Sequence, residues 1–143
     1  MATITRGARA DLHAATALLR ACVVLLTLGT AAIHASLGGL LFLANAAGYA
    51  VFAVAMVLPG RIGQLRWLVR LALLGFTATT IGAWFLFGAR FPLAYLDKGL
   101  EVALIACLAI EIWQVDGGPA AVAGRAGQLV KRLAAPFLAR PAR

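Results

Sequence analysis

Residues 92–115 read PLAYLDKGLEVALIACLAIEIWQV, an apolar run that is interrupted by Asp97, Lys98, Glu101 and Glu111. The run is long enough to cross a bilayer as a helix, which takes about 20 predominantly apolar residues. A charge within such a run is costly unless it is paired, hydrated or bound to a ligand. The stretch therefore predicts a membrane helix that carries a polar site.

Three similar stretches precede it, and together they predict an all-α, membrane-embedded four-helix bundle of two antiparallel hairpins. The spans are expected at residues 14–34, 37–58, 67–88 and 92–115, within one transmembrane domain that covers residues 1–117. Hydrophobic residues make up 63% of the chain and charged residues 13%, with a mean hydropathy of +0.93. Soluble domains contain only about 45–50% apolar residues. Because the turns are short, consecutive spans are expected to be antiparallel.

Basic residues are concentrated at one end of this expected bundle. They lie before the first span, around the turn between the second and third spans and after the fourth, whereas only Arg90 and Lys98 belong to the opposite side. By the positive-inside rule, both termini are expected in the cytoplasm of a prokaryotic cell, with the turns near His34 and Arg90 outside its plasma membrane. The net charge of +8 is spread over several turns, so the expected partner is the lipid bilayer and not nucleic acid.

The first span also has features of a secretion signal, because Arg20 precedes an apolar run that ends in small residues. The long basic region before that run and the bulky Ile33 argue against cleavage. Cys22 and Cys107 lie far apart on different spans. Neither a disulfide nor a redox pair is therefore indicated.

Residues 118–143 form a basic tail after the last span. Helical spacing places five apolar residues of this tail on one face, namely Val122, Ala126, Leu129, Leu133 and Phe137. One interpretation is a short amphipathic helix on the inner membrane surface. The other is a disordered tail that is attracted to anionic lipid.

The two expected hairpins show a weak internal similarity. A shift of fifty positions aligns four pairs of polar or aromatic residues: Arg20 with Arg70, Thr27 with Thr77, Thr30 with Thr80 and His34 with Trp84. The alignment indicates either a parallel repeat or chance similarity between membrane helices. The second span has no counterpart of Asp97, Lys98 and Glu101, so the charged site belongs to one hairpin only.

Helical geometry predicts two polar layers inside the bundle. The outer layer forms the expected ligand-binding pocket and contains His34, Asn45, Tyr49, Trp84, Arg90, Asp97, Lys98 and Glu101. The inner layer contains Glu111, with Arg20 and Arg70 as its expected charge partners. Threonines on the same stripes are expected to serve helix packing. Only Tyr49 can ionise between the layers, so the pattern favours an outward-facing polar pocket over a continuous proton path.

Glu101 is the residue of this pocket that most needs a partner. At about 13 Å below Pro92 it must be protonated, paired with Lys98 or Arg90, or bound to a cation. Asp97 is about 7 Å below Pro92, and solvation at the membrane interface would explain it together with Lys98. His34 is likewise expected to be an interfacial histidine. A metal site of His34, Asp97 and Glu101 has no ligand-spacing motif, so no metal is predicted.

The chain contains no pattern that indicates catalysis. Both histidines lie on the first span, which excludes a haem held by two histidines within one chain, and no nucleophile elbow, phosphate loop or zinc-protease motif occurs. No enzyme activity and no cofactor are therefore predicted. The leading hypothesis is a protein that binds, and helps to move, a small polar ligand or cation. Two alternatives stay open: an accessory or assembly subunit of a larger membrane complex or homo-oligomer, and a lipid or quinone site between the hairpins.

The residues Ile33-His34-x-x-Leu37-Gly38, Thr77-x-x-Thr80-Ile81-x-x-Trp84 and Asp97-Lys98-x-x-Glu101 carry a resemblance to other proteins. The chain before Gly117 resembles a group of small four-span membrane proteins from bacteria and haloarchaea. The resemblance implies fold and topology only, because the group offers no activity to carry over. Some members have glutamine at the position of Glu101, which counts against a mechanism that requires a carboxylate there.

Overall fold

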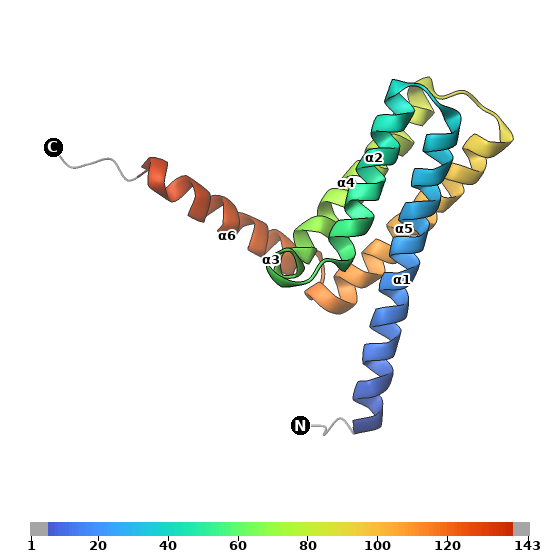
Figure 1. Ribbon diagram of the computed structural model, residues 1–143. Helices are drawn as coiled ribbons and strands as arrows, with labels where there is room; N and C mark the ends of the chain where they lie inside the picture. Colours follow the sequence, from blue (N-terminus) through green and yellow to red (C-terminus); the bar gives the residue numbers. More distant parts are fainter. Residues whose placement is uncertain (1–5, 139–143) are drawn as a thin grey trace.

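The computed structural model describes residues 6–138, and this part of the chain is helical apart from short turns (Figure 1). The elements in chain order are α1 (Arg6–Leu37), α2 (Leu40–Val57), α3 (Gly60–Gln64), α4 (Arg66–Phe87), α5 (Pro92–Asp116) and α6 (Pro119–Leu138). The prediction of an all-α chain is confirmed for the described residues. The first few and last few residues of the predicted domain and tail, 1–5 and 139–143, lie outside them.

Helices α1, α2, α4 and α5 lie side by side as a bundle (Figure 1). The α1–α2 and α4–α5 turns are at one end of it, and α3 and the start of α6 are at the other. α1 packs against both α2 and α5, which brings the first and last helices of the bundle into contact. The N-terminal part of α1 extends past the bundle, and α6 projects away from it. The first and fourth predicted spans are therefore neighbours.

Among the described residues, three helices are long and apolar enough to cross a membrane, and they correspond to the first three of the four predicted spans. They are His13–Leu37, Leu40–Val57 and Arg66–Phe87. α5 has 25 residues, which corresponds to about 37 Å of helix. α5 differs from these three candidate spans because it carries more charged residues. The described helices thus suit a membrane location.

Buried positions recur on each helix at alternating intervals of three and four residues. On α5 they are Ala94, Asp97, Glu101, Leu104, Leu108 and Glu111. The same spacing occurs on α2, at Ala46, Tyr49, Ala53 and Met56, and on α4, at Arg70, Leu73, Thr77 and Thr80. This seven-residue period is typical of helices that pack with a slight left-handed crossing. The side chains on one face of each bundle helix therefore form the interior of the bundle.

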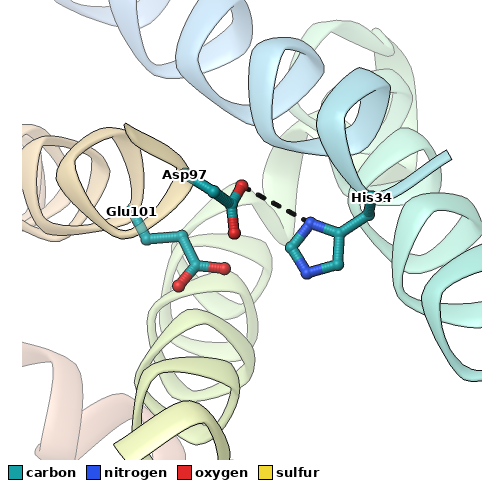
Figure 2. Close-up of side chains that lie close together, drawn as sticks. All are labelled: His34, Asp97 and Glu101. Atoms are coloured by element: carbon teal, nitrogen blue, oxygen red, sulfur yellow. Dashed lines mark ion pairs between the residues drawn. The ribbon is translucent and has the colours of Figure 1, made fainter. Parts of the chain in front are cut away.

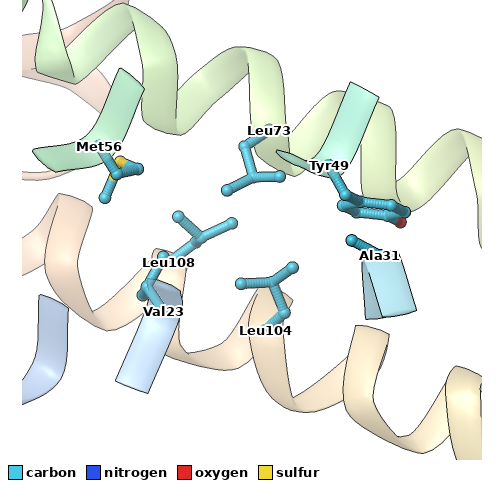
Figure 3. Packing of buried hydrophobic residues seen from close by; sticks show 7 residues of the cluster. All are labelled: Val23, Ala31, Tyr49, Met56, Leu73, Leu104 and Leu108. Atoms are coloured by element: carbon cyan, nitrogen blue, oxygen red, sulfur yellow. The ribbon is translucent and has the colours of Figure 1, made fainter. Parts of the chain in front are cut away.

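The centre of the bundle is an apolar layer, which consists of Val23, Met56, Leu73, Leu104 and Leu108. These side chains come from all four bundle helices and point toward one another (Figure 3). Each is fully buried. On α5 the layer lies between Glu101 and Glu111, so it separates the outer polar residues from the inner ones.

A close approach between α2 and α4 holds Tyr49 in place. A Cβ atom at Gly48 would lie 2.8 Å from the ring of Phe76, so only glycine fits there without a shift of that ring. Phe76 packs edge-on against Tyr49, with 4.9 Å between ring centroids. Such aromatic pairs contribute roughly 0.5–1.5 kcal/mol beyond the area that they bury. The contact directs the Tyr49 hydroxyl toward α5.

Candidate functional site

The site is built around two carboxylates on the buried face of α5. Asp97 and Glu101 are one helical turn apart, so both side chains project from the same face. Their exposed fractions are 2% and 0%. Solvation at the interface therefore does not explain Asp97, and that expectation is wrong. Both carboxylates depend on contacts within the protein.

Glu101 receives hydrogen bonds from three different helices. The Tyr49 hydroxyl on α2 lies 2.9 Å from its Oε1 atom, and the Thr80 hydroxyl on α4 lies at the same distance. Lys98 on α5 donates to Oε2 over 2.5 Å. Pairing of Glu101 with Lys98 was one of the predicted outcomes. The role of Thr80 was missed, because threonines on the polar stripes were assigned to helix packing.

Asp97 lies between Lys98 and His34. The Lys98 ammonium is 3.0 Å from Asp97 Oδ2, and His34 Nδ1 is 3.5 Å from Asp97 Oδ1 (Figure 2). Oδ1 is buried and has no hydrogen-bond partner among the described residues. The Lys98 side chain is 12% exposed, so it reaches toward the surface only in part. One ammonium therefore bridges the two carboxylates.

His34 is buried near the end of α1, with an exposed fraction of 3%. Its Nδ1 atom is 3.0 Å from the backbone carbonyl oxygen of Thr30. A carbonyl only accepts, so Nδ1 carries a proton, and in neutral imidazole the lone pair is then on Nε2. The ring edge that carries both nitrogens faces Asp97 and Glu101 (Figure 2). His34 therefore has partners within the bundle, and its position at the membrane interface stays a prediction.

We define the outer cluster as His34, Tyr49, Thr80, Asp97, Lys98 and Glu101. Within it, ligand atoms of His34, Asp97 and Glu101 lie within 4.8 Å of one another, a grouping that could hold a metal ion. With His34 neutral, two carboxylates face one ammonium. The cluster then carries one uncompensated negative charge.

Three predicted pocket residues do not join the outer cluster. Arg90 is exposed, lies 5.1 Å from the ring of Trp84 and donates to the carbonyl of Phe85, so the prediction that it pairs with Glu101 is wrong. The Trp84 indole donates to the carbonyl of Ala89 over 3.1 Å. Asn45 is half-buried on α2, and among the described residues no hydrogen bond joins it to the cluster.

A surface groove of about 460 Å³ lies beside the cluster, between α4 and α5. Its lining includes Trp84, Arg90, Tyr95 and Lys98 together with apolar residues. Lys98 is the residue that belongs to both the groove and the cluster. The predicted open polar pocket is therefore replaced by a closed polar cluster and an adjoining, largely apolar groove.

The inner network lies beyond the apolar layer and consists of Arg20, Arg70, Glu111, Asp116 and Arg125. Arg70 is 2% exposed and donates to Glu111 over 2.8 Å and to both carboxylate oxygens of Asp116, over 2.8 and 3.1 Å. Arg20 lies 3.2 Å from Glu111, so both of its predicted partners contact it. Arg20 and Arg70 are also the pair aligned by the fifty-residue shift. Asp116 and Arg125 were missed, because they flank the glycines that end the last predicted span.

The two polar regions differ in what they offer a ligand. In the inner network three arginines face two carboxylates, and every carboxylate has at least two charged partners. In the outer cluster a single ammonium serves two carboxylates, and His34 presents a nitrogen lone pair nearby. The outer cluster is therefore the better candidate for cation binding. No protein-family model, no curated protein and no solved structure matches this chain.

Proposed function

We propose that the protein is a four-span integral membrane protein that binds a small cation in its outer half. Three helices have the length and apolar character for spanning. The fourth span would be α5, whose carboxylates Asp97, Glu101 and Glu111 are all buried within the bundle. Its exposed large side chains are mainly apolar and include Val102, Ile110 and Trp113, with the polar Gln114 near the end of the helix. α5 therefore presents a lipid-compatible face despite its charges.

The orientation follows from the basic residues near the inner network. Arg20, Arg66, Arg70 and Arg125 lie toward the end of the bundle where α3 and α6 begin. By the positive-inside rule this end faces the cytoplasm, and the α1–α2 and α4–α5 turns face outward. The outer cluster then belongs to the half of the membrane farther from the cytoplasm.

The observation that carries the cation proposal is that two buried carboxylates of the outer cluster share one ammonium. Asp97 and Glu101 are almost fully buried, and Lys98 is their only fixed positive partner among the described residues. An uncompensated buried charge is strongly unfavourable in a membrane interior. A bound cation would remove this cost. Anionic ligands are disfavoured for the same reason.

The proposed activity is binding, because the apolar layer closes the path toward the cytoplasm. Val23, Met56, Leu73, Leu104 and Leu108 fill the interior between the outer cluster and the inner network. Their side chains offer a cation no oxygen or nitrogen ligand atoms. Translocation would require a second conformation in which this layer separates.

The test is cation-dependent stabilisation of the purified full-length chain in detergent. A ligand at about 100 times its dissociation constant adds roughly 2.7 kcal/mol of stability, which corresponds to a rise of about 5–10 °C in Tm. We expect such a rise from at least one of Na⁺, K⁺, Mg²⁺, Ca²⁺, Mn²⁺ or Zn²⁺, and expect Glu101→Gln to abolish it.

Glu111→Gln is the matched control, because Glu111 is as deeply buried as Glu101 but belongs to the inner network. This variant is expected to lower the starting Tm and to keep the cation response. An undiminished response in Glu101→Gln would contradict the proposed site.

A further inference from the structure

We propose that the cation is a divalent metal ion of the Zn²⁺ class, bound by His34, Asp97 and Glu101, and that Lys98 leaves the carboxylates when it binds. The inference rests on the cation site proposed above and adds the identity of the ion and its competitor. The three ligating residues are 3%, 2% and 0% exposed. Their ligand atoms lie within 4.8 Å of one another.

The donor set selects the class of metal. One imidazole nitrogen and two carboxylate oxygens suit Zn²⁺ and neighbouring first-row ions, which accept nitrogen ligands. Mg²⁺ and Ca²⁺ favour sites made of oxygen alone. Three protein ligands also leave an open position, as in zinc sites that bind water or a small ligand. His34 is therefore the residue that distinguishes this inference from cation binding in general.

The surroundings of the three ligands are already organised. The Thr30 carbonyl accepts the proton of His34 Nδ1, which leaves Nε2 for a metal; such an outer hydrogen bond commonly orients a ligating histidine. The hydroxyls of Tyr49 and Thr80 hold Glu101. Asp97 Oδ1 is buried without a hydrogen-bond partner among residues 6–138. It is an acceptor available for coordination.

A bound ion requires only a small contraction of the site. Ligand atoms about 2.0–2.1 Å from a tetrahedral metal lie roughly 3.4 Å from one another. With one ring nitrogen of His34 counted as its ligand atom, the ligand atoms of His34, Asp97 and Glu101 lie within 4.8 Å of one another. Rotation of one carboxylate can supply most of the difference between these two distances. The helices themselves therefore need no large movement.

Charge balance requires Lys98 to move. A dication beside two carboxylates is neutral, whereas retention of the ammonium would place an extra positive charge a few ångströms from the metal. That repulsion is large in a buried site. Lys98 also lines the groove beside the cluster, where Tyr95 lies. Aromatic faces attract an ammonium group, so the groove can receive the displaced side chain.

A calorimetric titration tests this inference. Zinc chloride is added to the full-length protein in detergent, and the heat of binding is measured. We expect one equivalent to bind, and expect His34→Gln and Asp97→Asn to weaken the affinity by more than about tenfold. His13→Gln is the matched control, because His13 is exposed near the start of the first candidate span. It should leave the affinity unchanged.

Lys98 variants test displacement separately. Lys98→Met removes the competing charge and is expected to tighten Zn²⁺ binding by about tenfold or more. Lys98→Arg keeps the charge and should bring no gain. Helical circular dichroism and a single gel-filtration peak confirm that each variant is folded, so a change in affinity can be assigned to the site.

The outcomes separate the two proposals. Equal Zn²⁺ affinity in His34→Gln and the native chain, or no gain in folded Lys98→Met, overturns this inference. Stabilisation by Mg²⁺, Ca²⁺ or a monovalent ion that depends on Glu101 but not on His34 also overturns it and leaves the proposed function intact. No response of the native chain to any cation overturns both.

Discussion

Arg70 and Arg20 contact the same carboxylate from very different surroundings. The side chain of Arg70 is 2% exposed and bonds to Glu111 and Asp116, whereas that of Arg20 is 28% exposed and reaches Glu111 alone. Loss of a buried partner leaves charges without compensation, but a partly exposed partner is replaced by water. The two arginines should therefore differ greatly in their contribution to stability.

We expect Arg70→Met to lower the free energy of unfolding by about 3–5 kcal/mol, because it leaves Asp116 and Glu111 buried and underneutralised. Arg20→Met should cost less than about 1 kcal/mol. Unfolding by SDS in mixed micelles, followed by circular dichroism, measures both values. Equal losses in the two variants would contradict the assignment of Arg70 as the centre of the inner network.

Among single residues, the sequence predicted some of the polar contacts and missed others, and the contacts of Glu111 with Arg20 and Arg70 were among those predicted. Glu101 was expected to need a partner, and Lys98 supplies one at i−3 on the same helix. Arg90 was predicted as a second partner, yet it stacks on Trp84, because local aromatic contact outweighs a distant charge. Thr80 and Asp116 were not identified, since their roles depend on Glu101 and Arg70 on neighbouring helices.

Among the elements, α6 differs most from the bundle helices. It runs from Pro119 to Leu138 and packs mainly against α5. Val122 is buried, while Val130 and Leu133 are each 64% exposed and flank the exposed basic residues Lys131 and Arg132. The helix predicted for the tail is therefore present, although the side chain of Phe137 lies outside the described ones. Its exposed composition suits the surface of an anionic membrane.

We expect α6 to rest on anionic lipid through Lys131 and Arg132, at about 1 kcal/mol for each basic residue. In nanodiscs that contain phosphatidylglycerol, amides 128–134 should exchange with deuterium more slowly than in phosphatidylcholine. Lys131→Glu/Arg132→Glu should remove this difference. Arg90→Glu, at the opposite end of the bundle, is the control and should preserve it. Equal exchange in both lipids for the native chain would contradict lipid contact.

The elements themselves were largely predictable, because long apolar runs and glycine-rich turns are local features of the chain. The helix bounds of α2 and α4 lie within a few residues of the predicted stretches. α1 begins earlier than predicted, since the polar residues before Ala14 continue the helix without a breaker. The packing of α1 against α5 was implied by the expected pairing of Arg20 with Glu111, which lie 91 residues apart.

The whole molecule has an asymmetric distribution of charge along the bundle. The outer cluster has an excess of carboxylate, and the inner network has an excess of arginine. This asymmetry agrees in sign with the positive-inside rule that underlies the proposed orientation. The orientation therefore leads to a direct test of which end of the bundle is outside.

In a chain with Cys22→Ala and Cys107→Ala, we expect Ser36→Cys to react with a membrane-impermeant maleimide added to intact cells. Gln64→Cys should react only after permeabilisation, because it lies in α3 at the other end of the bundle. Gel shifts of the labelled protein provide the measurement. The reverse pattern would show that the termini are outside.

The apolar layer also determines how membrane voltage would act on a bound ion. An electric potential falls mainly across regions that exclude water, and Val23, Met56, Leu73, Leu104 and Leu108 form such a region. A cation that reaches Asp97 and Glu101 from outside crosses only the part of the field before this layer. Passage of one charge through the whole field amounts to about 2.3 kcal/mol per 100 mV. Occupancy of the outer cluster by a cation should therefore depend only weakly on the membrane voltage. Movement of the cation across the apolar layer would depend on the voltage much more strongly.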